Sequence, residues 1–593
     1  MNDRRMTTEE FPWRRIALVW MFVSLLMLAN AAKNIAIAQF PDPDDVLRLV
    51  QVRDLLGGQG WFDLNQYRID PAGDVPMHWS RLVDLPLALM IGALTPLLGT
   101  ANAELLSVVM VPLLTMLATM LIIARMTWRL FDTETAGLAC LAFGFLPFLI
   151  FQFQPMRIDH HGWQIFAVAL AMFAINMRSQ WAGGALAGLA MAAGLLVSLE
   201  LLPVAAVFGA VLALRWLRDP AQRVWLVGYL QSLALSLGAL YLATRGLSDL
   251  AAYCDAITLP HIGLFAAVAL GASALALPKA LPWPAIVGGL ACAGLAGITI
   301  FGVASPSCLR TPFGELDPLV REFWYLNVRE GRPMWAQPIM AIPQLFQIGL
   351  AFVVAVHLFR SADGKVRGWW RDYLIVLAGT VLLGLLVWRS MAFASVLAAI
   401  PLGFALKLAL DKLRNARETA AKALAVGGLM LVLVPSAPVV AASYVTAPDI
   451  DEDELIKGPL QASSCDLTAS SASLNALEPG VIFAPLDIGP ALLQRSAHTV
   501  VATGHHRAEK AMRDIIVGYT SSPDITRALM RKHAARYVVV CTDIMEPNLY
   551  AEEGGRNSFA ARLLRNDAPE WMERVALDTP KSFRVWRIAD RNE

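Results

Sequence analysis

Long apolar runs constrain this chain more than any other feature. They recur through the first 440 residues, interrupted by short breaks that carry Arg or Lys. A helix needs about 20 apolar residues to cross the hydrocarbon core of a bilayer, and helices satisfy their own backbone hydrogen bonds there. The composition agrees, because 56% of the residues are hydrophobic and only 16% are charged. The sequence therefore predicts a polytopic α-helical membrane protein.

The length rule and the charged breaks together predict thirteen membrane-spanning helices. The stretch 84–99 is also apolar, but it is short and contains Pro86 and Pro96, so we predict a helix at the membrane surface. The first run is too long for a signal peptide and is read as an uncleaved span. The predicted spans are 15–38, 104–124, 134–152, 163–178, 182–198, 200–216, 224–243, 261–278, 284–303, 342–360, 372–388, 391–410 and 421–442.

The distribution of Lys and Arg predicts the orientation. The N-terminal segment carries four Arg residues, and with thirteen spans the basic breaks all fall on the same side as the N-terminus. That side is predicted to be cytoplasmic, which puts loops 39–103, 153–162 and 304–341 and the C-terminal tail outside. We expect a multi-pass protein of the cytoplasmic (inner) membrane.

The composition changes abruptly at the acidic segment 449–454. Beyond it, short β-rich runs (481–484, 499–502, 537–541 and 583–588) alternate with helical stretches at 507–517 and 522–534. Alternation of this kind is typical of a small α/β domain. The predicted division is a membrane domain at 1–444 and a periplasmic α/β domain at 445–593.

Charge and cysteine content argue against a nucleic-acid partner and against a zinc site. The 49 basic and 48 acidic residues nearly cancel, so nucleic acid is not expected as a partner. No CxxC pair occurs among the six cysteines, which argues against a zinc site. Cys140 and Cys292 fall in apolar runs and are expected to be inert packing residues. Cys465 and Cys541, both in the tail, can form a disulfide if the tail is extracytoplasmic.

Three acids follow the first span. Asp42, Asp44 and Asp45 lie where the chain leaves the membrane. Carboxylates suit Mg²⁺ or Mn²⁺ and can also act as general bases. An acid before the apolar-periodic segment that begins at Val46 is equally typical of a helix N-cap.

The second outer loop is tight and polar. It holds Asp159, His160 and His161 with hardly any slack, so these side chains must lie at the membrane surface. An Asp-x-His pair can ligate one divalent cation. Ordinary interfacial polarity is the alternative, but an acid and two histidines exceed what it requires.

Further charged residues come from later segments. Glu330 in loop 304–341 can ligate a metal, and Arg329 and Arg332 can bind phosphate; a solvated loop is the alternative. Arg389 lies between two spans on the predicted outer side, against the charge trend. A guanidinium pairs bidentately with phosphate, while the alternative is snorkelling to the interface. Together these residues predict one site for a membrane-anchored phosphate or diphosphate.

Local motifs resemble those of the GT-C class of membrane glycosyltransferases, and within it the catalytic subunit of bacterial and archaeal oligosaccharyltransferase. The layout of residues 1–440 is similar. Asp44 with Val52-Arg-Asp54 and Gly60-x-Phe62 resembles the first acidic motif, in which Asp42 or Asp45 can take the place of Asp44. Asp159-His-His161 resembles the second motif. Asn327-Val-Arg-Glu330 before Pro333 resembles the motif of the fifth outer loop, and Arg389 falls where the family has an Arg near the lipid phosphate.

The resemblance implies a polyprenyl-phosphate-linked donor, an extracytoplasmic acceptor (glycan, lipid or protein), inversion at the anomeric carbon and a divalent metal, Mg²⁺ or Mn²⁺. Asp44, Asp159 and Glu330 would be catalytic, and these three with His161 would hold the metal. Arg389 and Arg332 would bind the donor phosphate. A monomer or loose oligomer is expected.

The tail departs from the family pattern. The family's Trp-Trp-Asp motif, which reads the Asn-x-Ser/Thr acceptor, is missing from it, and Trp369-Trp370 falls on the predicted cytoplasmic side. Instead the tail has Pro485-Leu-Asp-Ile-Gly489 and Gly504-His-His-Arg507. We assign both segments to acceptor or glycan contact, with His505, His506 and Arg507 in the second; Asp45 and His160 are further candidates for such contact. A turn and a solvated polar patch are the alternative.

Two other functions remain open. A glycolipid transporter or flippase would be expected to show internal repeats and charged or broken helices at the midplane. No clear repeat is visible, and the polar residues gather in outer loops. A non-catalytic scaffold that displays its tail would leave the loop acids unexplained.

Overall fold

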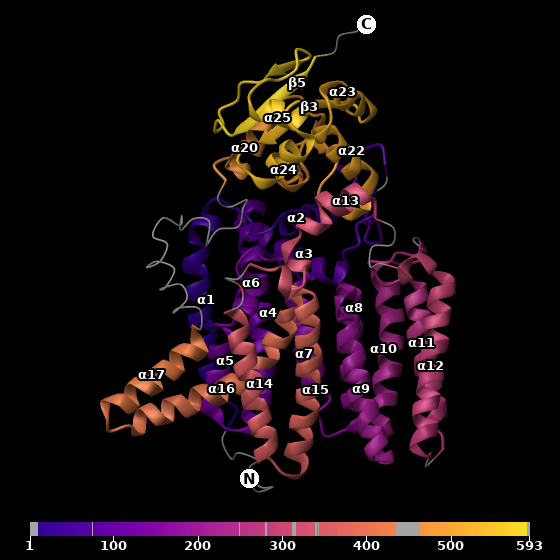
Figure 1. The fold of residues 1–593 in the computed structure, drawn as a ribbon, viewed down its shortest axis with the longest axis vertical. Coiled ribbons are helices and arrows are strands. Elements are labelled where there is room, and N and C mark those ends of the chain that lie inside the picture. Colours follow the sequence, from indigo (N-terminus) through magenta and orange to yellow (C-terminus); the bar gives the residue numbers. More distant parts are fainter. Residues whose placement is uncertain are drawn as a thin grey trace.

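A computed structural model describes residues 10–589, except 74, 248–249, 279–280, 311–315, 339–340, 342 and 435–462. A bundle of long helices carries a smaller α/β unit on one end (Figure 1). The protein is therefore a multi-pass α-helical membrane protein with a C-terminal α/β tail, as predicted. The bundle helices are α1 (Trp13–Ala36), α4 (Thr100–Leu130), α5 (Thr133–Phe143), α6 (Pro147–Phe153), α7 (His161–Ala174), α8 (Gln180–Val197), α9 (Leu202–Arg218), α10 (Arg223–Thr244), α11 (Leu259–Leu275), α12 (Trp283–Ala304), α14 (Gln344–Ser361), α15 (Gly364–Leu386), α16 (Met391–Asn415) and α17 (Thr419–Leu433).

Every predicted span coincides with a helix over its described residues, but the count differs. By length and composition, ten of the described helices can cross a membrane, or eleven if the α5–α6 pair, bent by 74°, is one span. The helices α7, α11 and α17 fall short of that length. The last predicted span, 421–442, extends into residues outside the described part.

Small residues bring α8 and α10 close together. A Cβ on Gly184 would lie 2.4 Å from the carbonyl oxygen of Trp225, and one on Gly188 would lie 2.3 Å from that of Tyr229. Both distances are shorter than real Cβ contacts, so only glycine allows this approach. Pairs of small residues four apart are a common helix interface in membranes.

Two helices of the first outer loop lie between the bundle and the tail. These are α2 (Pro43–Leu56) and α3 (Arg81–Leu98). Asp84 in the first turn of α3 pairs with Arg48 of α2, and Glu104 near the start of α4 pairs with Arg53. Both ends of α3 are therefore held at the level of α2. This supports the predicted surface placement, although α3 is also long and apolar enough to cross.

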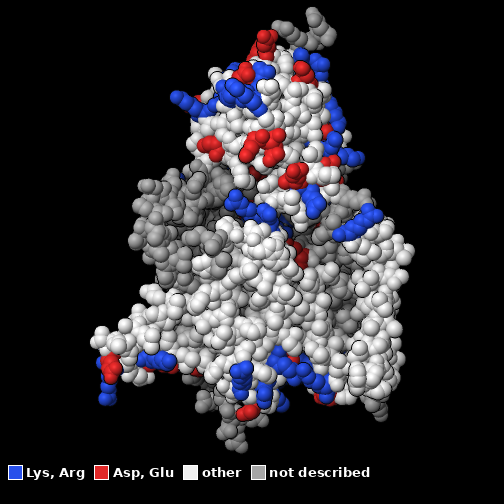
Figure 2. Space-filling view, in the orientation of Figure 1, with Lys and Arg blue, Asp and Glu red and all other residues white. Residues whose placement is uncertain are grey.

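Charged residues avoid the middle of the bundle. Figure 2 shows a broad band without Lys, Arg, Asp or Glu on the visible face, with basic residues below it and mixed charges on the tail above. A band of this kind is what a hydrocarbon layer requires.

The tail is a five-stranded mixed sheet with helices on it (Figure 1). Four of its strands match predicted runs, whereas β4 was not predicted. The strand order is β2-β1-β3-β5-β4, with β1 parallel to β2 and β3, and β5 antiparallel to β3 and β4. The strands are β1 (Val481–Phe483), β2 (Thr499–Val500), β3 (Ala535–Cys541), β4 (Met572–Arg574) and β5 (Phe583–Ile588), and the helices are α20 (Leu467–Ser473), α21 (Gly489–Arg495), α22 (Glu509–Thr520), α23 (Pro523–Lys532), α24 (Met545–Gly554) and α25 (Phe559–Leu564). Outside the tail, α13 (Pro318–Phe323) lies in the loop before α14.

The first outer loop continues the edge of this sheet. Ile69 pairs in parallel with Val500 of β2, and the N–H of Asp70 donates to the carbonyl of Val500 at 3.0 Å. The N–H of Val500 donates in turn to the carbonyl of Arg68 at 2.9 Å. The tail is thus joined to the membrane domain through backbone hydrogen bonds.

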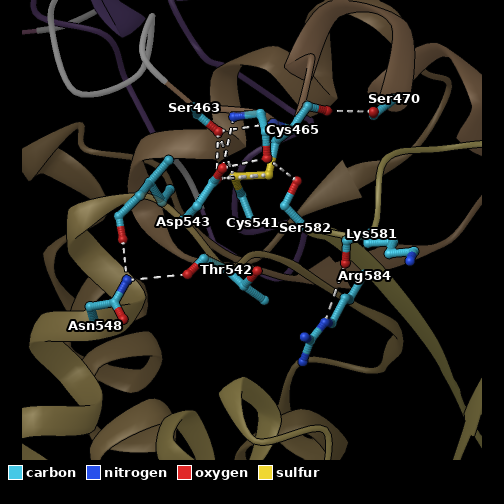
Figure 3. The surroundings of a disulfide bond; sticks show 12 residues. Ser463, Cys465, Ser470, Cys541, Thr542, Asp543, Asn548, Lys581, Ser582 and Arg584 are labelled. Carbon is cyan, nitrogen blue, oxygen red and sulfur yellow. Dashed lines mark hydrogen bonds between the residues drawn. A yellow bond between two sulfur atoms is a disulfide. The ribbon is translucent and has the colours of Figure 1, made fainter. Parts of the chain in front are cut away.

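Two disulfides close loops on the tail side of the molecule. The bond between Cys465 and Cys541, which the sequence left open, is present and fixes the start of the tail to the end of β3, with Asp543 beside it (Figure 3). A second bond, between Cys254 and Cys308, was not predicted. Of the two free cysteines, Cys140 is buried as expected, while Cys292 is exposed on α12.

Candidate functional site

The acids of the first loop lie at the N-terminus of α2. Asp42 is the N-cap, and its carboxylate accepts from the N–H of Asp44 at 2.9 Å. Pro43 occupies the first helical position, which its fixed φ favours. The N-cap alternative therefore holds for Asp42, while Asp44 is left exposed on the first turn and Asp45 points into the protein.

Asp45 positions the second outer loop. Its fully buried carboxylate accepts from the backbone N–H groups of Ile158 at 2.8 Å and of Asp159 at 2.9 Å. Arg157 Nη1 lies 3.1 Å from the other oxygen of the same carboxylate. Both oxygens of this carboxylate are therefore engaged within the protein. Asp45 thus holds the loop in place, a role different from the predicted acceptor contact.

Arg157 lies at the centre of the acids. Its guanidinium is 3.0 Å from Asp42, 3.1 Å from Asp45 and 2.9 Å from Asp159, and its side chain is 1% exposed. Sequence reasoning missed this residue. The sequence did contain a signal for it. Arg157 lies on the predicted outer side of the membrane, in the short loop that carries the Asp159-His-His161 motif.

Asp159 and His161 form a buried pair. Asp159 Oδ2 lies 2.7 Å from His161 Nδ1, and Oδ1 accepts from the His161 N–H at 3.0 Å. Burial alone would raise the pKa of Asp159, but Arg157 and His161 outweigh it and hold that pKa well below its usual range. The Nε2 of His161 is buried and has no hydrogen-bond partner among the described residues. His160 stacks on His161 with ring centroids 4.2 Å apart.

Arg389 meets two acids from different loops. It forms an ion pair with Glu200, and its Nη1 lies 3.1 Å from Glu330. The Trp388 N–H donates to the Arg332 carbonyl at 3.0 Å, which fixes loop 304–341 beside Arg389. Arg332 itself is exposed. Glu200, which sequence reasoning also missed, interrupts an apolar run, and an acid at such a position is a signal of function.

The acids influence one another. Although Asp44 reaches solvent, the surrounding protein and then the charges of Asp42 and Asp159 raise its pKa to about 7. Glu330 is among the carboxylates that contribute, so it faces the same centre. Burial would also raise the pKa of Glu330, but Arg389 and Arg157 lower it. A carboxyl with a pKa near neutrality suits a general base.

The donor set fits a divalent cation, in part. Ligand atoms of Asp159, His160 and His161 lie within 4.8 Å of one another, whereas Asp44 and Glu330 lie outside this tight group. Two guanidinium groups face a surplus of carboxylates, and a cation would offset that negative charge. The buried, unpartnered Nε2 of His161 is a free ligand atom beside them. The carboxylates are Asp42, Asp44, Asp45, Asp159, Glu200 and Glu330.

Asp487 of the tail faces this site from above. It lies with Asp42 in the lining of a cavity of about 40 Å³ between the end of α1 and the tail. Burial, followed by the charge of Asp42, raises the pKa of Asp487 to about 6. The segment 485–489 is thus placed next to the acidic centre.

The three polar residues of segment 504–507 lie in a different cluster. His505 contacts His78, and both His506 and Arg507 contact Asp255. The structure therefore groups them with residues of the first outer loop and of the α10–α11 connection rather than with Asp159.

Comparison with known proteins identifies the fold. The sequence matches no family model and no curated protein. Among solved structures, the archaeal oligosaccharyltransferase AglB from Archaeoglobus fulgidus, in complex with an inhibitory peptide and a dolichol-phosphate, aligns with 99% of this chain and 75% of its own, at a TM-score of 0.63 and 13% identity. This chain has the oligosaccharyltransferase fold. The apo form of the A. fulgidus enzyme aligns with 96% of this chain and 74% of its own, at 0.63 and 15% identity. The GT-C fold expected from the local motifs is confirmed over almost the whole chain.

Proposed function

We propose that this protein is a glycosyltransferase that moves a sugar or oligosaccharide from a polyprenyl-phosphate or polyprenyl-diphosphate carrier to an extracytoplasmic acceptor. One observation carries the proposal. On a fold shared with AglB, the acids Asp44, Asp159 and Glu330 gather with Arg389 at the end of the bundle that faces the tail. A membrane-anchored phosphate would meet these residues at the bilayer surface.

The reaction we propose is a single displacement with inversion. A lone pair on an oxygen or nitrogen of the acceptor attacks the anomeric carbon. The bond from that carbon to the phosphate oxygen breaks, and the phosphate leaves with the electron pair. Arg389 stabilises the developing charge, and a carboxylate of the acidic centre takes the acceptor proton. Arg389 exchanges its contact with Glu330 for the phosphate as the donor binds.

Asp44, Asp159, His161 and Glu330 would hold Mg²⁺ or Mn²⁺. Such a cation supplies Lewis-acid stabilisation of the leaving phosphate. Support comes from the surplus of carboxylates around the unpartnered His161 Nε2. A further structure of the A. fulgidus enzyme, a complex with Zn and sulfate, aligns with 96% of this chain at a TM-score of 0.60.

We place the protein in the cytoplasmic membrane with the tail, residues 445–593, in the periplasm and residues 1–444 as the catalytic membrane domain. Both disulfides lie on the tail side, and disulfides persist in oxidising compartments. The acceptor is expected to approach from this side, where Asp487 faces Asp42. A glycolipid flippase is the alternative, and it requires no chemistry at Asp159.

Transfer from radiolabelled polyprenyl-linked sugars by the purified full-length protein, with and without Mn²⁺, tests the proposal. We expect Mn²⁺-dependent transfer that Asp159→Ala abolishes. Asp524→Ala, which removes an exposed acid from α23, is the matched control and should retain activity. Unchanged transfer by Asp159→Ala would refute the site assignment. Movement of labelled lipid across vesicles without transfer to any acceptor would favour the flippase.

A further inference from the structure

Four side chains from three distant segments meet beneath the tail, away from the sugar-transfer site. His78 comes from the first outer loop, Asp255 from the α10–α11 connection, and His505 and His506 from the tail. Asp255 follows Cys254 directly, so the Cys254–Cys308 disulfide ties its segment to the end of α12. This convergence brings three imidazole rings and one carboxylate together.

The nitrogen and oxygen atoms of the cluster face one another. His78 Nδ1 lies 2.9 Å from His505 Nε2 and 4.0 Å from Asp255 Oδ2, and His506 Nε2 lies 2.6 Å from the same oxygen. A tetrahedral Zn²⁺ with bonds of 2.0–2.2 Å separates neighbouring ligand atoms by about 3.3 Å. The ligand atoms of His78, Asp255 and His506 all lie within 4.8 Å of one another, and His505 adds a nitrogen 2.9 Å from His78 Nδ1.

We propose that His78, Asp255, His505 and His506 bind a structural divalent cation of the zinc class. His78, Asp255 and His506 form the core of this set, and His505, whose Nε2 faces His78, is the fourth candidate ligand. Four protein ligands would close the coordination shell, as they do in structural zinc sites. The cysteine spacing argued against a zinc site, but this set contains no sulfur. The proposal is independent of the sugar-transfer site, whose ligands come from other residues.

The surroundings of the cluster orient its ligands. Arg507 donates to both oxygens of Asp255, at 3.0 and 2.8 Å, and also to the carbonyl of Pro76 at 3.1 Å. Arg245 donates to the carbonyl of His78 at 2.9 Å. The ring of Trp324 stacks on His506, with centroids 5.9 Å apart. Groups that hold the ligands of a metal in this way are a regular part of metal sites.

The cluster joins three parts of the chain that are far apart in sequence. A cation held by these residues would join the tail to the first outer loop and to the α10–α11 connection at one point.

Zinc content measured on the full-length protein tests the proposal. The parent for the experiment is the double variant Asp159→Ala/His161→Ala, which removes the proposed sugar-transfer cation. Each protein is loaded with Zn²⁺, passed through a desalting column and analysed by mass spectrometry of the metal. We expect about one zinc per chain in the parent, none after His506→Ala is added, and about one after His357→Ala, which removes an exposed histidine of α14.

Cobalt provides a second measurement on the same Asp159→Ala/His161→Ala parent, whose cooperative thermal unfolding checks that it is folded. Co²⁺ added to this protein should give the visible absorption bands of a tetrahedral site, and one equivalent of Zn²⁺ should remove them. The proposal is wrong if the parent retains no zinc, if His506→Ala leaves the zinc content unchanged, or if the Co²⁺ spectrum is that of the octahedral aqueous ion. None of these results depends on sugar transfer.

Discussion

Arg157 Nη1 lies 3.1 Å from Oδ2 of Asp45, and both side chains are almost completely buried. The same guanidinium contacts Asp42 and Asp159. Arg157 thus compensates three carboxylates at once. Removal of one partner from a buried network leaves charges unpaired, which usually costs several kcal/mol.

Arg157→Ala is therefore expected to destabilise the protein by about 3–5 kcal/mol. Thermal unfolding in detergent measures the effect. Arg562→Ala, which breaks the exposed pair with Asp567, is the control and should cost less than about 1 kcal/mol. If the two variants lose the same stability, the buried contacts of Arg157 contribute no more than an exposed ion pair.

Replacement of Arg389 should affect catalysis. Loss of a donor that stabilises transition-state charge typically lowers the rate about 10²–10³-fold, and we expect this for kcat/KM of Arg389→Gln. Arg332→Ala should have a smaller effect, because the Arg332 side chain is exposed and the residue meets Trp388 through its backbone carbonyl. If both variants transfer sugar at the wild-type rate, the leaving phosphate does not contact this side of the site.

The Cys465–Cys541 disulfide is expected to stabilise the tail. It closes a loop with a sequence separation of 76 residues, for which the chain-entropy relation gives about 4.5 kcal/mol. Cys465→Ser/Cys541→Ser should lower the unfolding temperature, as should reduction of the wild type. Cys292→Ser, at a free cysteine, is the control and should leave the temperature unchanged.

Stability of the tail should decrease as pH rises from about 4.5 to about 8. Burial, followed by the charge of Asp487, raises the pKa of Glu546 to about 8 from an ordinary value of 4.5. Because the pKa is raised in the folded state, the stabilisation is fully present below about pH 4.5 and is lost as pH rises through about 8. Tyr550 and Tyr519 also face this carboxyl. Unfolding measured between pH 5 and 9 should show the decrease, and Glu546→Gln should flatten it.

The α8–α10 contact should not tolerate a larger side chain. Gly188→Leu places a Cβ 2.3 Å from the carbonyl oxygen of Tyr229, so the helices must separate. Overpacking of this kind costs about 1–3 kcal/mol. Gly238→Ala on α10 is the matched control, since a Cβ there meets no atom within 4 Å. If Gly188→Leu leaves the stability of the protein unchanged, the two helices can move apart without cost.

The apolar runs were sufficient to predict the helices, because a membrane span must satisfy its backbone internally over a fixed length. They could not predict the 74° bend between α5 and α6, which lies inside one continuous apolar run. The α/β nature of the tail was likewise predictable, while β4 was not: it has three residues, and only the first is buried.

For the site, the sequence indicated the motif residues but not their partners. Asp159 and His161 were identified because they are too polar for their position. Glu200 and Arg157 were missed because their significance depends on contacts with Arg389 and Asp45 across the fold. The same holds for His78 and Asp255, each an isolated residue in its own segment.

The pairing of Ile69 with Val500 limits how evolution or engineering can exchange parts of this protein. The tail has a compact sheet of its own, which suggests a module that could be replaced to change the acceptor. However, one edge of that sheet is completed by a loop encoded more than 400 residues earlier. A chimaera that takes the tail from a homologue without its first outer loop would leave β2 with an unmatched edge. The two segments should therefore be inherited, and transplanted, as a pair.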